Sequence, residues 1–111
     1  MSAHTHSVES DAAFDDVATA LIPVGATEGR MFDCRTLYHV HTMVAVLYDA
    51  QIAVRLGRNS DVLREMLAAG RAHEWDPTRQ NRPFRDWILV GLDRREEWIR
   101  LALAAWSSTT D

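Results

Sequence analysis

The chain has 111 residues, of which 47% are hydrophobic and 25% charged, with a net charge of −4 at pH 7 and a single cysteine. This length fits one domain, and the composition is that of an ordinary globular protein, which excludes disorder throughout. One cysteine excludes an intramolecular disulfide, and the first residues lack the pattern of a signal peptide, so we expect a cytoplasmic protein.

Charge is distributed unevenly along the chain. Residues 1–29 contain five acids and no arginine or lysine, whereas residues 30–111 are nearly neutral. This acidic first part makes nucleic-acid binding unlikely, because phosphate contacts dominate such affinity. Two interpretations of it stay open: it docks on a basic partner, or it only keeps the chain soluble.

The first expected helix follows a short polar terminus. Residues 1–9 lack periodicity, which predicts a flexible N-terminus. Ser10 is a candidate N-cap, and Pro23 ends the helix. One apolar stripe at helical spacing runs through it: Phe14, Val17, Ala18 and Leu21. Residues 24–32, which include two glycines, are predicted to be a loop.

Residues 33–57 form the longest apolar stretch of the sequence. On a helical wheel their apolar residues cover every side. A membrane span would place His39, Asp49 and Arg55 among others in the bilayer, so no membrane association is expected. The stretch therefore predicts a central helix that is wrapped by other helices.

Two more helices are predicted towards the C-terminus. Residues 61–75 are amphipathic, and residues 83–107 have an apolar face too wide for one neighbouring helix to cover. A polar loop that contains Asp76-Pro77 separates them. Runs that alternate apolar and polar residues as strands do are absent, so we predict an all-α fold: a compact four-helix bundle with a central hydrophobic second helix. Its single domain spans residues 10–107, followed by a tail at 108–111.

A polar stripe runs along the expected central helix. His41, Tyr48 and Arg55 recur at intervals of seven residues. They are candidates for a binding pocket with a general base, a hydroxyl and an anion clamp, or for a seam between two subunits of a homodimer. Arg95 falls on the apolar face of the fourth helix, where a buried guanidinium needs an acid. We expect Asp49 to be that partner.

A basic run surrounds Pro83. Arg79, Arg82 and Arg85 lie three residues apart, near Trp75. Arginines next to an aromatic side chain are candidates for gripping a phosphate group or single-stranded nucleic acid, whereas the plain alternative is a solvated loop.

Metal and cofactor sites are not expected. His39 and His41 would point about 200° apart on a helix and could not share one ion. The sequence contains no phosphate-binding loop and no dinucleotide-binding fingerprint. Cys34 is either a reactive thiol near a helix start or an ordinary buried cysteine.

One short motif points to an enzyme class. Arg35 and His41 are separated by five residues, and this spacing fits the R-x4-6-H motif. In that respect the chain resembles the HEPN ribonucleases, which are small helical proteins. The resemblance implies that Arg35 and His41 form a catalytic pair in a dimeric cleft. The motif alone does not assign the chain to that family.

The leading functional hypothesis is a small non-enzymatic interaction protein, a regulator, inhibitor or subunit that docks on a partner protein. Four tryptophans supply side chains of the kind that interfaces favour. The alternative is a small enzyme or ligand-binding protein with a polar pocket. An exposed apolar patch would support the first hypothesis, and an enclosed polar cavity the second.

Overall fold

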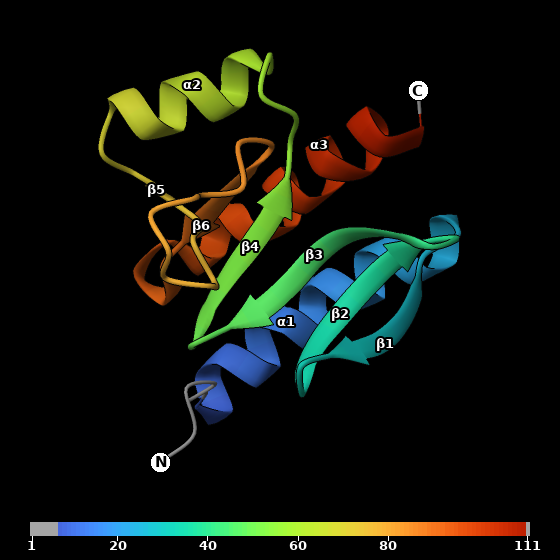
Figure 1. Cartoon of the computed structure of the whole chain (residues 1–111). Helices are drawn as coiled ribbons and strands as arrows, with labels where there is room; N and C mark the ends of the chain where they lie inside the picture. The colour runs from blue at the N-terminus through green and yellow to red at the C-terminus, as the bar shows by residue number, and fades with distance from the viewer. Residues whose placement is uncertain (1–6, 111) are drawn as a thin grey trace.

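A six-stranded antiparallel sheet forms the centre of the protein, with the strand order β1-β2-β3-β4-β6-β5 (Figure 1). The computed structural model describes residues 7–110. Most of the terminus that was predicted to be flexible lies outside these residues. Two long helices, α1 and α3, pack on one face of the sheet. The architecture is therefore α+β, and the prediction of an all-α four-helix bundle is wrong.

The elements follow one another in a simple order along the chain. The first half contains α1 (Val8–Leu21), the 3-10 helix η1 (Ile22–Val24), β1 (Thr27–Met31), β2 (Cys34–His39), β3 (Thr42–Tyr48) and β4 (Gln51–Arg55). The second half contains α2 (Asp61–Ala68), β5 (His73–Glu74), β6 (Trp87–Val90), the 3-10 helix η2 (Leu92–Glu97) and α3 (Trp98–Thr110).

Helix α1 agrees with the sequence prediction except at its start. All four residues of the predicted apolar stripe are buried, and the helix ends just before Pro23. The N-cap is Ser7 rather than Ser10. The two serines form a capping box, in which the hydroxyl of each accepts a hydrogen bond from the backbone N–H of the other.

The stretch predicted as a central helix is instead a meander of three strands, β2, β3 and β4. Three two-residue turns connect β1 to β2, β2 to β3 and β3 to β4. They consist of Phe32-Asp33, Val40-His41 and Asp49-Ala50, and none contains glycine. Five of these six residues have positive φ angles: Phe32, Asp33, Val40, Asp49 and Ala50. Tight hairpins favour glycine or asparagine at such positions, so the usual hairpin signal is missing from the sequence.

Burial on both faces explains why this stretch looked apolar on every side of a helical wheel. Val44, Leu47 and Val54 pack against the helices, whereas Val46 and Ala53 belong to a second cluster on the opposite face. Central strands that are covered on both faces lose the alternation of apolar and polar residues that marks a half-exposed strand.

The two predicted C-terminal helices are only partly present. Helix α2 begins at Asp61, but it ends at Ala68, just before Gly70, which adopts a φ of 71°. The stretch 83–107 divides into β6, η2 and most of α3. Strand β6 pairs with β4 in the middle of the sheet, which accounts for the apolar run Trp87–Val90.

Arg35 joins α1 to the sheet. Its guanidinium contacts Asp15 at 2.8 Å, Glu28 at 2.8 Å and Asp11 at 3.5 Å, and it lies 5.1 Å from the centroid of the Phe14 ring. Hydrogen bonds to Glu28 raise the pKa of Arg35, and those to Asp15 act in the same direction. Two of the acids predicted to dock on a basic partner, Asp11 and Asp15, are thus engaged within the protein.

Ala50 offers a test of the strained hairpins. Its φ of 62° costs a residue with a Cβ about 1 kcal/mol. We therefore expect Ala50→Gly to raise the free energy of unfolding by about 0.5–1 kcal/mol in urea denaturation. Ala12→Gly, in the exposed part of α1, is the matched control and should lower it by about 1 kcal/mol. A loss of stability in Ala50→Gly would contradict the proposed strain.

None of the helices within residues 7–110 combines the length and the apolar character needed to cross a lipid bilayer.

Candidate binding site

The face of the sheet opposite α1 and α3 carries an apolar cluster of its own. Cys34, Val46, Ala53, Trp75 and Trp87 are its buried members. Met31, Met43, Tyr48 and Leu89 pack around them and are partly exposed. No helix within residues 7–110 covers this cluster, and Trp75 reaches it from the segment that follows β5.

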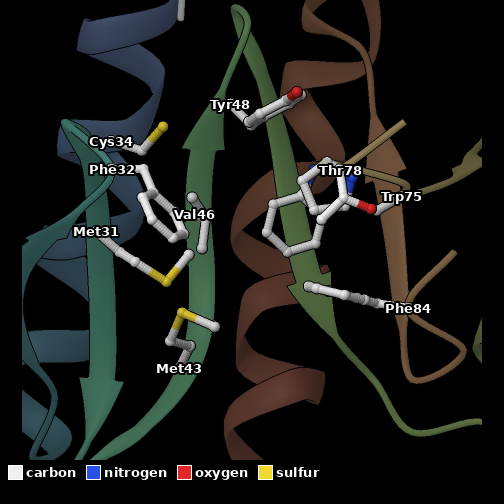
Figure 2. Close-up of a pocket in the computed structure, with 10 residues that line it drawn as sticks. Met31, Phe32, Cys34, Met43, Val46, Tyr48, Trp75, Thr78 and Phe84 are labelled. Atoms are coloured by element: carbon white, nitrogen blue, oxygen red, sulfur yellow. The ribbon is translucent and has the colours of Figure 1, made fainter. Parts of the chain in front are cut away.

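A pocket with a volume of about 380 Å³ opens on this face (Figure 2). One side comes from the β1–β2 hairpin and includes Met31, Phe32 and Cys34. The opposite side comes from residues 75–84 and includes Trp75 and Phe84. Phe32 is 79% exposed and Phe84 is 38% exposed, so two aromatic side chains at the pocket present apolar surface to solvent.

The remaining lining residues are also mostly apolar. They are Met43, Val46, Tyr48, Pro77 and Thr78. Methionine side chains are flexible and polarisable, so they adapt to apolar groups of different shapes. The site is therefore suited to contact with an apolar group, because few of its lining side chains carry a hydrogen-bonding group.

Trp75 is the centre of the aromatic wall. Its ring contacts those of Trp87 at 4.9 Å, Phe84 at 5.4 Å and Tyr48 at 5.6 Å between centroids. The backbone N–H of Phe84 donates to the carbonyl of Trp75 at 2.8 Å and holds the loop closed. Among the described residues, the indole N–H of Trp75 is a buried side-chain donor without a hydrogen-bond partner. Such a group gains free energy when an acceptor reaches it.

Cys34 contributes apolar surface rather than reactivity. The thiol is buried, and burial raises its pKa, with a further increase from the nearby charge of Asp33. A raised pKa keeps the thiol protonated at neutral pH, whereas a nucleophilic cysteine needs the thiolate. The interpretation as an ordinary buried cysteine fits this environment better.

The predicted polar stripe is not assembled. His41 lies in the β2–β3 turn, Tyr48 ends β3 and Arg55 ends β4. Only Tyr48 lines the pocket. Arg55 instead lies 3.8 Å from Asp86, whose pKa is lowered chiefly by a hydrogen bond from Arg58. Spacing that would align residues on a helix scatters them over successive strands of a meander.

Asp49 and Arg95 do not form the expected pair. Asp49 lies exposed in the β3–β4 turn, and Arg95 lies exposed in η2. Within residues 7–110 no ion pair joins them. The predicted burial of Arg95 is wrong, because η2 and not a continuous helix precedes α3.

The three loop arginines lie in one segment of the chain. Arg79, Arg82 and Arg85 are exposed in the segment between β5 and β6, which also supplies Pro77, Thr78 and Phe84 to the pocket. Arg85 lies 3.7 Å from Glu74. The segment that lines one side of the pocket thus also carries exposed arginines.

The resemblance to a helical ribonuclease is not supported by the positions of its two residues. Arg35 lies within β2, and His41 lies in the turn beyond the end of that strand. The extended part of this chain, from Arg35 to His39, alone spans about 13 Å. The guanidinium of Arg35 is also occupied by three acids.

His39 and His41 do not lie on a helix, contrary to the sequence prediction. His39 ends β2, and its ring contacts Trp106 at 5.0 Å between centroids. Within the described part of the chain, no group of three or more histidine, cysteine, aspartate or glutamate side chains could hold a metal ion. His4 and His6 lie outside this part.

Sequence reasoning missed most of the pocket. Met31, Phe32, Met43, Val46, Thr78 and Phe84 were not recognised as site residues. Phe32 and Asp33 form a hairpin turn, and an aromatic residue in a turn is a signal that could have been noticed once the hairpin was identified. Met31, Met43 and Val46 come together through strand pairing, and Thr78 and Phe84 reach them from the loop between β5 and β6.

Comparison of the chain with protein-family models, with curated proteins and with solved structures gives no match.

Proposed function

We propose that this protein is a non-enzymatic binding protein whose open sheet face takes up an apolar segment of a partner polypeptide. The observation that carries the proposal is the pocket between Phe32 and Phe84, with its apolar lining and adaptable methionines. Exposed aromatic side chains of this kind are typical of interfaces.

An extended peptide suits the site better than a small molecule does. The pocket lies between two exposed aromatic residues and is not enclosed, so the ends of a longer chain can leave it on both sides.

Charge around the pocket specifies the partner further. Arg79 and Arg82 are exposed on the segment that lines one side. Asp33 and Asp49 are exposed in the turns on the side of the hairpins. We expect the bound segment to carry large apolar residues with an acidic residue at the end that faces the arginines.

Selection of a random peptide library displayed on phage tests this proposal. The wild-type protein should enrich peptides with aromatic or large aliphatic residues beside an acidic residue. Met43→Glu places a charge in the pocket, and it should weaken binding of the enriched peptides about tenfold or more. Leu103→Glu is the control, because Leu103 is 40% exposed on α3, on the other side of the sheet, and should bind as the wild type does.

Two further measurements make the outcome decisive. Selection on Arg82→Glu should shift the enriched peptides from acidic to basic residues. Titration with sodium laurate, followed by tryptophan fluorescence, examines the small-molecule alternative. If no peptide family is enriched and laurate binds in a manner that Met43→Glu abolishes, the pocket serves small apolar molecules and the peptide proposal is wrong.

A further inference from the structure

Strand β1 forms one edge of the sheet. It pairs only with β2 within the described residues, so one side of its backbone has no strand partner. Natural edge strands are commonly protected by proline, by bulges, by very short length or by charged side chains. The charged residues of β1 are Glu28 and Arg30, which favour a partner strand of complementary charge. β1 has five residues, Thr27–Met31, without a proline. The edge is open to pairing with another strand.

The direction of the backbone groups on β1 follows from the hairpin. Met31 and Cys34 close a two-residue turn, and such a closing pair directs its N–H and C=O groups towards each other. Since these directions alternate along a strand, Arg30 and Glu28 direct their backbone groups outward. A new antiparallel strand would therefore form its hydrogen bonds with these two residues.

The side chains of Glu28 and Arg30 carry opposite charges, so one copy of β1 is complementary to a second copy. If two copies of β1 pair antiparallel with Gly29 opposite Gly29, Glu28 of each copy lies opposite Arg30 of the other. Shifting the register by one residue on each strand would place Glu28 opposite Glu28, or Arg30 opposite Arg30. Opposite charges on directly facing residues stabilise a strand pair, and like charges destabilise it. Charge thus selects one register.

Exposed apolar residues flank both ends of this edge. Phe32 follows β1 and is 79% exposed, whereas Ile22 and Val24 precede it and are 47% and 55% exposed. Antiparallel pairing brings the end of one β1 towards the start of the other. Each Phe32 then approaches the segment that contains Ile22 and Val24 in the second copy, on both sides of the two-fold axis.

We propose that two copies of this chain pair through their β1 edges, antiparallel about Gly29, to form one continuous sheet with facing Glu28 and Arg30. The interface shares Met31 and Phe32 with the rim of the peptide pocket, but the inference rests on the backbone and charges of β1 and does not depend on the proposed function. Either can fail without the other, because the pocket is tested with Met43 and the edge with Glu28 and Arg30.

Sedimentation equilibrium over a range of micromolar concentrations is the first test. The wild-type protein should be a dimer. Arg30→Glu places two acids opposite each other at both ends of the strand pair and should weaken dimerisation about tenfold or more. Arg71→Glu makes the same charge change on an exposed residue away from the edge, and it should dimerise as the wild type does.

A charge-swap experiment identifies the register. Arg30→Glu and Glu28→Lys should each dimerise poorly alone, but an equimolar mixture should form heterodimers, because every facing pair then has opposite charges. Glu28 also contacts Arg35 at 2.8 Å, so the fold of Glu28→Lys must be checked by circular dichroism. If that variant does not fold, hydrogen exchange of the Glu28 and Arg30 amides gives the same information, since dimerisation should slow it in the wild type.

Three results would overturn the proposal. One is a wild-type protein that remains monomeric at all concentrations. Another is a dimer that Arg30→Glu and Arg71→Glu affect equally. The third is fast exchange of the β1 amides in the protein alone combined with protection when a selected peptide is added, which would assign the edge to the peptide partner.

Discussion

Trp98→Ala is expected to lower the free energy of unfolding by about 4 kcal/mol, because removing a fully buried tryptophan leaves a large cavity. Trp98 begins α3 and is completely buried in the core between the helices and the sheet. Its indole N–H donates to the carbonyl of Gly91 at 3.1 Å, which ties the helix to the end of β6. The substitution removes both the packing and this hydrogen bond.

Urea denaturation followed by far-ultraviolet circular dichroism measures the effect. Domains are stable by roughly 5–15 kcal/mol, so the variant should unfold at much lower urea concentration. Leu103→Ala, on the same helix but 40% exposed, should change stability by no more than about 0.5 kcal/mol. A loss below about 1 kcal/mol in Trp98→Ala would show that α3 is not anchored as described.

The second large effect is expected at Arg35. Replacing it with methionine keeps much of the side-chain length but leaves Asp11, Asp15 and Glu28 facing one another without a cation. The side chain of Arg35 is only 16% exposed, so this network is worth more than a surface ion pair. We expect Arg35→Met to lower the free energy of unfolding by about 2 kcal/mol.

The salt dependence distinguishes lost charge pairing from lost packing. Repulsion between the remaining carboxylates should be screened by salt, so the deficit of Arg35→Met relative to wild type should shrink as sodium chloride is added. Arg64→Met breaks an exposed pair with Asp61 and should change stability little. A deficit that does not respond to salt would assign the effect of Arg35 to its contact with Phe14 instead.

Local signals predicted α1 well. The stripe that begins at Phe14 is buried on one side of the helix only, so its helical period survives in the sequence, and Pro23 marks the end without ambiguity. The start of helix α2 was predicted for the same reason, since its apolar residues also recur at helical spacing. The prediction extended the helix to residue 75 and was wrong there, because the chain leaves the helix at Gly70.

The sheet could not be predicted in this way. Val46 and Ala53 are buried on one face and Leu47 and Val54 on the other, so the central strands show no alternation. The turn Asp49-Ala50 lacks the glycine or asparagine that would have divided the stretch into hairpins. Tertiary packing, which decides both features, is not visible in a window of local sequence.

The candidate site shows the same limit. Tyr48 was selected for its position on a helical stripe that does not exist, yet it lines the pocket. The sequence predicts for Trp75 only a role beside the loop arginines, although it forms the centre of the aromatic wall. Residues from β1, β3 and the segment after β5 meet only because the strands pair in the observed order.

The order of the strands also has a consequence for folding kinetics. β1 to β4 are joined by two-residue turns, so their pairing needs only short-range encounters along the chain. β6 must find β4 across residues 56–86, and closing that longer loop costs more entropy. The segment that carries Trp75 and Phe84 lies within this loop. We therefore expect one wall of the binding pocket to become ordered late, after the meander that supplies the other wall has formed.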